Sequence, residues 1–220
     1  MKNLIILNFE SKNCKTEKNF FDEISKNYKH EILEKFNIVK INVIGIELSK
    51  KFILNIKQEL KSYLPLIRAY DDEFTHYILI TIDRDIEEKF NLLVNNFSKI
   101  EKVLYAKGFN KTNINIKFLL LPQNTNFEYL ICMLFDKKDA AKIKVNLDFI
   151  KTSNSLLHKV FKNKNEWING PVVRKIQNQS FVKNNVFDNL RDNLSERKKI
   201  IIIPNNLKEN SIINYHDFFN

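Results

Sequence analysis

The sequence predicts an α/β protein with a mainly parallel sheet flanked by helices. Short apolar runs alternate with longer segments in which apolar residues recur at helical spacing, and this order repeats through residues 4–135. Such alternation is typical of parallel strands joined by right-handed helical crossovers. Hydrophobic residues make up 44% of the chain, which is enough to fill the core of such a domain.

Four segments are compact and apolar enough to be buried strands. They are Leu4–Phe9, Ile38–Ile44, Tyr77–Ile82 and Ile114–Leu121. Because parallel strands run in one direction, we expect their carboxyl ends along one edge of the sheet, where ligands bind in this architecture.

The segments between these strands carry the apolar period of amphipathic helices. The first helix is expected over residues 17–36, the second from Leu48 to Leu64 before Pro65, and the third from Phe90 to Leu104. A fourth helix is expected to begin within Phe127–Phe135, after Pro122 has ended the preceding strand.

The last part of the chain is predicted to be a small, mostly helical extension. Weaker apolar patterns indicate short helices near residues 156–161 and 182–194, and a late strand at Ile200–Ile203. Residues 151–220 hold twelve Lys or Arg and six Asp or Glu, so the extension is basic. Because the chain has no long linker, we expect residues 1–150 to form the α/β domain and the extension to pack on it.

The formal net charge of +10 favours polyanionic partners such as nucleic acid, since a positive field raises their rate of encounter. A general bias toward lysine is an equally open explanation. The two cysteines, Cys14 and Cys132, have no zinc-binding spacing, and no apolar stretch approaches the length of a membrane span. We therefore expect a cytoplasmic protein without a membrane partner, and a partner protein or self-association stays open.

Acidic residues follow three of the four predicted strands. Glu10 comes after the first, Asp83 and Asp85 after the third, and Glu128 after the fourth, while Glu17 opens the first helix. If the strand ends meet at one edge, these carboxyl groups converge, and a hard cation such as Mg²⁺ or Mn²⁺ would relieve their repulsion. For each acid taken singly, the alternative is a position at a helix N-terminus.

Three segments of the chain occur in an order and spacing that resembles a known family. They are Leu4-Ile5-Ile6-Leu7 … Glu10 with Lys15-Thr16-Glu17, the run Tyr77–Asp85 that ends in Asp-Arg-Asp, and Asn124–Leu130 with its Phe-Glu pair. Over roughly residues 1–136 this pattern resembles the Toprim (topoisomerase–primase) domains, and most closely their RloB-like branch.

The resemblance implies a metal-dependent nuclease or related phosphotransferase that acts on DNA or RNA, with a role in defence against mobile elements. It implies that Glu10 acts as general acid or base, and that Glu10, Asp83 and Asp85 hold Mg²⁺ or Mn²⁺. By the same resemblance, Glu17 and Glu128 complete the catalytic set.

Basic residues near these acids are expected to contact the phosphates of a nucleic acid. They are Lys12, Lys15 and Arg84, and the alternative for each is an ordinary solvated surface. Ser11 stands where Toprim domains usually carry Gly after the first glutamate. A second hypothesis is therefore a catalytically degenerate Toprim-like module, which binds nucleic acid or a partner protein without cleaving it.

Overall fold

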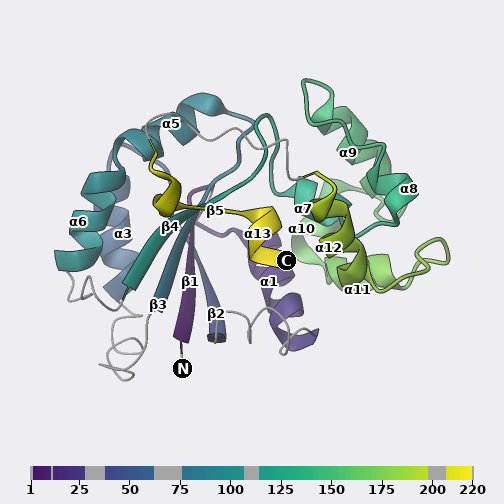
Figure 1. Cartoon of the computed structure of the whole chain (residues 1–220), viewed down its shortest axis with the longest axis horizontal. Helices are drawn as coiled ribbons and strands as arrows, with labels where there is room; N and C mark the ends of the chain where they lie inside the picture. The colour runs from purple at the N-terminus through teal and green to yellow at the C-terminus, as the bar shows by residue number, and fades with distance from the viewer. Residues whose placement is uncertain are drawn as a thin grey trace.

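The structure is a computed structural model, described for residues 2–10, 12–27, 38–61, 76–106, 114–197 and 207–219. Its strands are β1 (Lys2–Asn8), β2 (Ile38–Gly45), β3 (His76–Thr81), β4 (Ile114–Leu120) and β5 (Ile212–Asn214). They form one sheet in the order β2-β1-β3-β4-β5, and each neighbouring pair is parallel (Figure 1). The predicted α/β class is confirmed, and the four predicted strands match β1–β4 to within two residues.

Both faces of the sheet are buried, because alternate side chains of each strand enter two separate apolar cores. In β1, Leu4 and Ile6 belong to one core, whereas Ile5 and Leu7 belong to the other. Burial on both sides explains why these strands are nearly continuous apolar runs instead of alternating apolar and polar residues.

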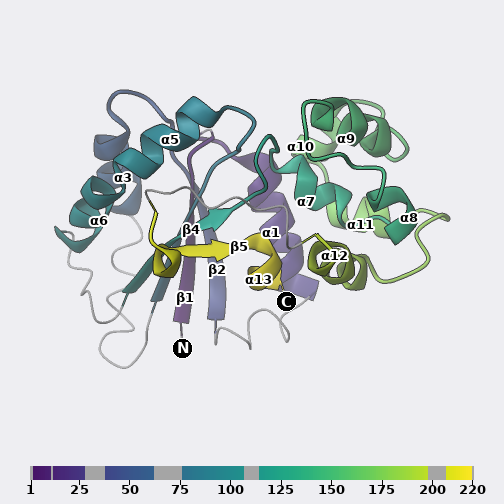
Figure 2. The ribbon, with the colours of Figure 1, turned by 45° about the horizontal axis from the view of Figure 1, so that its top comes forward.

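One core lies beneath α3 (Phe52–Lys61), α5 (Glu87–Asn95) and α6 (Phe97–Ala106), at the left in Figures 1 and 2. The single helix that we expected from Phe90 to Leu104 is therefore two helices, with Asn96 as the C-cap of the first. The rings of Phe90 and Phe97 both contact Phe118 of β4, with centroid distances of 6.2 and 5.1 Å. The break lets both helices pack on the same strand.

The other core is covered by α1 (Lys15–Asn27) and α13 (Tyr215–Phe219). The ring of Phe20 in α1 lies 5.2 Å from Phe127 and 6.3 Å from Phe219, measured between centroids. Of the helix expected over residues 17–36, the described portion begins two residues earlier and ends at Asn27, and residues 28–37 lie outside the described residues. These contacts hold the start of α1 close to the carboxyl edge of the sheet.

Within the described residues, six α-helices follow β4 and make up what we call the helical part, residues 128–197, which lies beside α1 at the right in both views (Figures 1 and 2). They are α7 (Glu128–Cys132), α8 (Lys137–Ala140), α9 (Phe149–Leu157), α10 (Lys164–Asn169), α11 (Val172–Gln177) and α12 (Val186–Ser195). The boundary expected at residue 150 falls within α9, and the expected strand Ile200–Ile203 lies outside the described residues. No helix of the described ranges is long and apolar enough to cross a membrane.

The chain returns from the helical part to the sheet, because β5 pairs in parallel with β4 from Phe118 opposite Ile212 onward. Sequence patterns did not predict β5, which is only three residues long. The helix after it is tied to β3 by a hydrogen bond of 3.0 Å between the hydroxyl groups of Thr81 and Tyr215. The C-terminal residues therefore complete the α/β layer.

Polar contacts fix the helical part to α1. The backbone N–H of Val173 donates to Glu23 Oε2 at 2.6 Å, and Asn19 Nδ2 donates to the carbonyl oxygen of Ile168 at 3.3 Å. Since α1 begins at the sheet edge, these bonds place α10 and α11 next to that edge as well.

Within the helical part, the buried side chain of Asn193 holds α12 against the segment that follows α7. Its Nδ2 donates to the carbonyl oxygens of Met133 at 2.9 Å and Phe135 at 2.8 Å. Buried carbonyl groups that lose their donors raise the free energy of the folded state.

We predict that Asn193→Ala lowers the free energy of unfolding by about 1–3 kcal/mol, because two buried carbonyl groups lose a partner. The matched control is Asn91→Ala, which makes the same change at an exposed position of α5. Urea denaturation of both variants measures the difference. Equal stability of the two variants would contradict the importance of this contact.

Candidate active site at the carboxyl edge of the sheet

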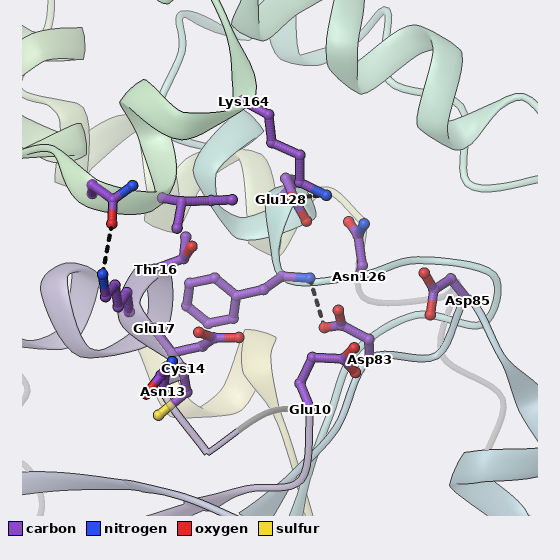
Figure 3. Close-up of a pocket in the computed structure, with 14 residues that line it drawn as sticks. Glu10, Asn13, Cys14, Thr16, Glu17, Asp83, Asp85, Asn126, Glu128 and Lys164 are labelled. Carbon is purple, nitrogen blue, oxygen red and sulfur yellow. Dashed lines mark hydrogen bonds and ion pairs between the residues drawn. The ribbon is translucent and has the colours of Figure 1, made fainter. Parts of the chain in front are cut away.

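A pocket of about 490 Å³ lies at the carboxyl edge of the sheet (Figure 3). The segments after β1, β3 and β4 line it together with the start of α1 and with α10. All five acids singled out in the sequence line this pocket: Glu10, Glu17, Asp83, Asp85 and Glu128. The convergence expected from the order of the strands is therefore present in the structure.

Asn8, at the end of β1, connects two of these acids. Its side chain is 1% exposed, accepts the backbone N–H of Glu10 at 3.0 Å and donates from Nδ2 to Glu17 Oε1 at 3.3 Å. We did not identify Asn8 from the sequence. The signal was available, because an amide at the end of an otherwise apolar buried strand needs a hydrogen-bond partner.

The segments after β3 and β4 are tied to each other by their backbones. The N–H of Arg84 donates to the carbonyl oxygen of Thr125 at 2.7 Å. In return, the N–H of Asn124 donates to the carbonyl oxygen of Arg84 at 3.0 Å. Asn124 adopts a φ of 60°, a left-handed conformation that asparagine tolerates better than most residues. The N–H of Phe127 then donates to Asp83 Oδ1 at 2.9 Å (Figure 3). These bonds hold Asp83 beside the residue that precedes Glu128.

The helix-cap alternative fails for Asp83. Helix α5 begins at Glu87 with Ile86 at its N-cap position, and the carboxyl group of Asp83 bonds to the segment after β4 instead. Glu17 does lie in the first turn of α1, where an acid favours the helix dipole, and it also lines the pocket.

Burial and mutual repulsion make the pocket retain protons. Burial raises the pKa of Glu17 to about 7, with a further rise from the charges of Glu128 and Glu10. The pKa of Asp83 lies well above its usual value, chiefly because of burial and then because of the surrounding carboxyl groups. Burial also raises the pKa of Glu10, which the ammonium group of Lys89 partly opposes. A cation that entered the pocket would compete with these protons.

Two lysines and one tryptophan contact the glutamates of the pocket. Lys89 Nζ of α5 lies 3.7 Å from Glu10 Oε1, and Lys164 Nζ of α10 lies 3.9 Å from Glu128 Oε1. Trp167 Nε1 donates to the same Glu128 oxygen at 3.4 Å. The sequence carries no signal for Lys164 or Trp167, because they reach Glu128 only through the packing of the helical part.

Of the basic residues predicted to contact phosphates, Lys15 lines the pocket and donates from Nζ to Asn169 Oδ1 at 3.2 Å. Lys12 does not line it. Its exposed ammonium group lies 3.4 Å from Glu59 Oε1, on α3.

Arg84 is buried, and this corrects the expectation that it contacts a nucleic acid. Its side chain is 2% exposed, and its Nη1 donates to the carbonyl oxygen of Leu121 at 3.3 Å. The guanidinium carbon lies 4.4 Å from the centroid of the Phe90 ring, and Nη2 lies 3.5 Å from Glu87 Oε1. The buried contacts of Arg84 therefore help to fix the turn that carries Asp83 and Asp85.

Cys14 also lines the pocket, but its thiol is unsuited to nucleophilic catalysis. Burial raises the pKa of this thiol to about 11, although Lys18 opposes the rise. The reactive form of cysteine is the thiolate, which is scarce at neutral pH for such a group. The chemistry of the pocket is therefore that of its carboxyl groups.

The oxygen donors of the pocket fit Mg²⁺ or Mn²⁺ in kind, because both ions prefer carboxylate and carbonyl oxygens. Asn126 Oδ1 adds a buried amide oxygen that accepts no hydrogen bond within the described residues. In those same residues, however, no three Asp, Glu, His or Cys side chains are grouped closely enough to hold one ion. Binding of one ion by three of these acids would therefore require their side chains to move closer together.

Comparisons with family models, with curated proteins and with solved structures give no match to this chain. The likeness to Toprim domains therefore stays a prediction from three sequence segments, and the geometry of the pocket carries the functional argument.

The raised pKa of Glu17 predicts a pH-dependent stability. Between the ordinary pKa of 4.5 and the folded-state value of about 7, the folded protein keeps a proton that the unfolded chain has released. The free energy of unfolding then falls as pH rises through this window, by about 1–3 kcal/mol.

Glu17→Gln has no such proton, so we expect its free energy of unfolding to change less between pH 5 and pH 8 than that of the wild type. Glu88→Gln changes an exposed acid of α5 outside the pocket and is expected to behave as the wild type. Denaturant unfolding at both pH values tests this. An undiminished pH dependence in Glu17→Gln would show that another group is responsible.

Proposed function

We propose that this protein is a metal-dependent nuclease, or a related phosphotransferase, that acts on nucleic acid. The observation that carries the proposal is the gathering of five carboxyl groups, from chain segments far apart in the sequence, in one pocket at the carboxyl edge of a parallel sheet. Such crowding raises the free energy of the ionised pocket unless a cation is bound, so it favours a functional site over a structural one.

Asp83, Asp85 and Glu10 are the proposed ligands of Mg²⁺ or Mn²⁺, since they follow adjacent strands and line the same side of the pocket in Figure 3. When bound, such an ion polarises a phosphoryl oxygen and promotes formation of a nucleophile from water. Burial raises the pKa of Glu10, and this is the direction of shift that suits a carboxyl group acting as general acid or base. Glu17 and Glu128 complete the catalytic set.

A phosphodiester substrate fits the basic residues at the same pocket. Lys15 and Lys164 line it, and Lys89 contacts Glu10. Ammonium groups of this kind can transfer from a carboxylate to a substrate phosphate once a metal ion neutralises the acids. The net charge of +10 supports attraction of a polyanion, and the Toprim resemblance adds defence against mobile elements to the proposal.

We predict cleavage of labelled DNA or RNA in the presence of Mg²⁺ or Mn²⁺ and none in EDTA. Asp83→Asn should lower the rate by about a hundredfold or more, because it removes a charge at the reacting centre. Glu88→Gln, outside the pocket, serves as the matched control and should cleave normally. Product formation in EDTA, or full activity of Asp83→Asn, would refute the proposed chemistry.

Lys164 of the helical part should affect binding of the substrate more than the rate of the chemical step. Lys164→Gln is expected to raise KM for the nucleic acid by about tenfold, because a phosphate contact is lost, with a smaller change in kcat. Lys162→Gln removes an exposed charge two residues away that does not line the pocket. Steady-state kinetics of both variants provides the test, and an equal effect of the two would indicate that only net charge matters.

A second candidate function is a binding module without catalysis. It is favoured by the pairing of Glu10 with Lys89 and of Glu128 with Lys164, and by the lack of a three-ligand group among the described residues. This candidate gains support if the wild type binds nucleic acid in a salt-dependent way but yields no product with either metal.

A further inference from the structure

A second hollow, of about 280 Å³, lies on the helical part and shares no lining residue with the carboxylate pocket. It is lined by one face of α9 and by the connection between α8 and α9. These two helices lie at the upper right of the ribbon in Figure 1. Its polar lining residues are the lysines Lys142, Lys144, Lys151 and Lys159, the hydroxyl residues Thr152 and Ser155, and one acid, Asp148.

The sequence of α9 explains why this hollow is polar. Lys151, Ser155 and Lys159 recur at intervals of four residues, so they lie on the same side of the helix and its C-terminal turn. The opposite side carries the buried residues Phe149 and Leu157, which pack into the core of the helical part. The polar side of α9 therefore faces outward, and the α8–α9 connection adds Lys142 and Lys144 to it.

Two of the four lysines are held in place, and two are free to bind a ligand. The Nζ atoms of Lys142 and Lys159 lie 2.6 and 2.7 Å from the same oxygen, Asp139 Oδ1. Lys144 and Lys151 are exposed and have no ion-pair partner within the described residues. Even with Asp139 and the exposed Asp148 counted, the lysines outnumber the acids, so the hollow attracts anions.

We propose that this hollow binds the phosphate backbone of the nucleic acid on which the carboxylate pocket acts. Ammonium groups and hydroxyl groups are the side chains that most often donate to backbone phosphates, and the hollow supplies four lysines with Thr152 and Ser155. The proposal rests on the proposed function for the identity of the polymer, but binding in this hollow does not require cleavage.

Two features favour a nucleic acid over a free phosphate ion. Leu147 and Ile150 are 97% and 56% exposed beside the lysines, so apolar side chains are available to contact unpaired bases. The two hollows are also separated by few side chains. His158, next to the lining residue Lys159, lies 5.7 Å from Trp167 between centroids, and Trp167 donates to Glu128 of the carboxylate pocket. One strand is therefore proposed to contact both sites on the helical part.

The test measures binding of short labelled DNA and RNA by fluorescence anisotropy in EDTA, where no turnover occurs. The double variant Lys144→Gln/Lys151→Gln should raise Kd by about tenfold at low salt. The slope of log K against log salt concentration should become shallower by about 1.4–1.8, as expected for two lost phosphate contacts.

The matched control is Lys50→Gln/Lys57→Gln, which removes the same amount of positive charge. Both lysines are exposed; Lys57 is in α3 and Lys50 precedes it, on the other side of the sheet. This control should keep a nearly wild-type Kd and salt slope. Thermal unfolding verifies that both double variants remain folded, which is expected because the substituted side chains are exposed.

Three results would overturn the inference: no binding by the wild type, equal losses in the two double variants, or an unchanged Kd in Lys144→Gln/Lys151→Gln. If that variant instead loses binding to anionic phospholipid vesicles while its oligonucleotide binding is unchanged, the hollow contacts a membrane surface and our assignment is wrong. The outcome is separable from the proposed function, because a protein that never cleaves can show the expected loss. Conversely, if the protein cleaves nucleic acid but the Lys144→Gln/Lys151→Gln variant keeps the wild-type Kd, only the assignment of this hollow is refuted.

Discussion

Carboxyl groups gathered in a partly buried pocket repel one another, and this repulsion must be balanced by protons, by lysines or by a metal ion. In this structure burial raises the pKa values of Glu17, Asp83 and Glu10, which favours bound protons, and Lys89 and Lys164 lie near Glu10 and Glu128. In the proposed function a cation would take over this role from the protons and lysines. This balance links the electrostatics of the pocket to the proposed chemistry.

The backbone, more than any side-chain pair, brings the acids together. The reciprocal bonds between Arg84 and the Asn124–Thr125 turn join the segments after β3 and β4, and the Phe127 N–H then fixes Asp83. Asn8 performs the same task between Glu10 and Glu17.

The helical part is more than an appendage to the sheet. It contributes Lys164, Ile168 and Asn169 to the wall of the carboxylate pocket, and its Trp167 donates a hydrogen bond to Glu128. It also presents the lysine-lined hollow on α9. Its attachment to α1 through Glu23 and Asn19 places these groups relative to the acids. The protein therefore combines an acidic pocket with a basic hollow, and both positions depend on the packing of the helical part.

The sequence by itself determined the α/β class, four of the strands to within two residues, and the acids that meet at the sheet edge, because apolar periodicity and strand direction are local properties of the chain. The prediction that Arg84 contacts phosphates was wrong, because the sequence around an arginine between two aspartates does not show whether its side chain is buried or exposed. Only the tertiary structure decided the three-residue strand β5, the break at Asn96, and the arrival of Lys164 and Trp167 at Glu128. These features depend on packing between segments distant in the sequence. Such packing produces no pattern of apolar residues in either segment from which it could be predicted.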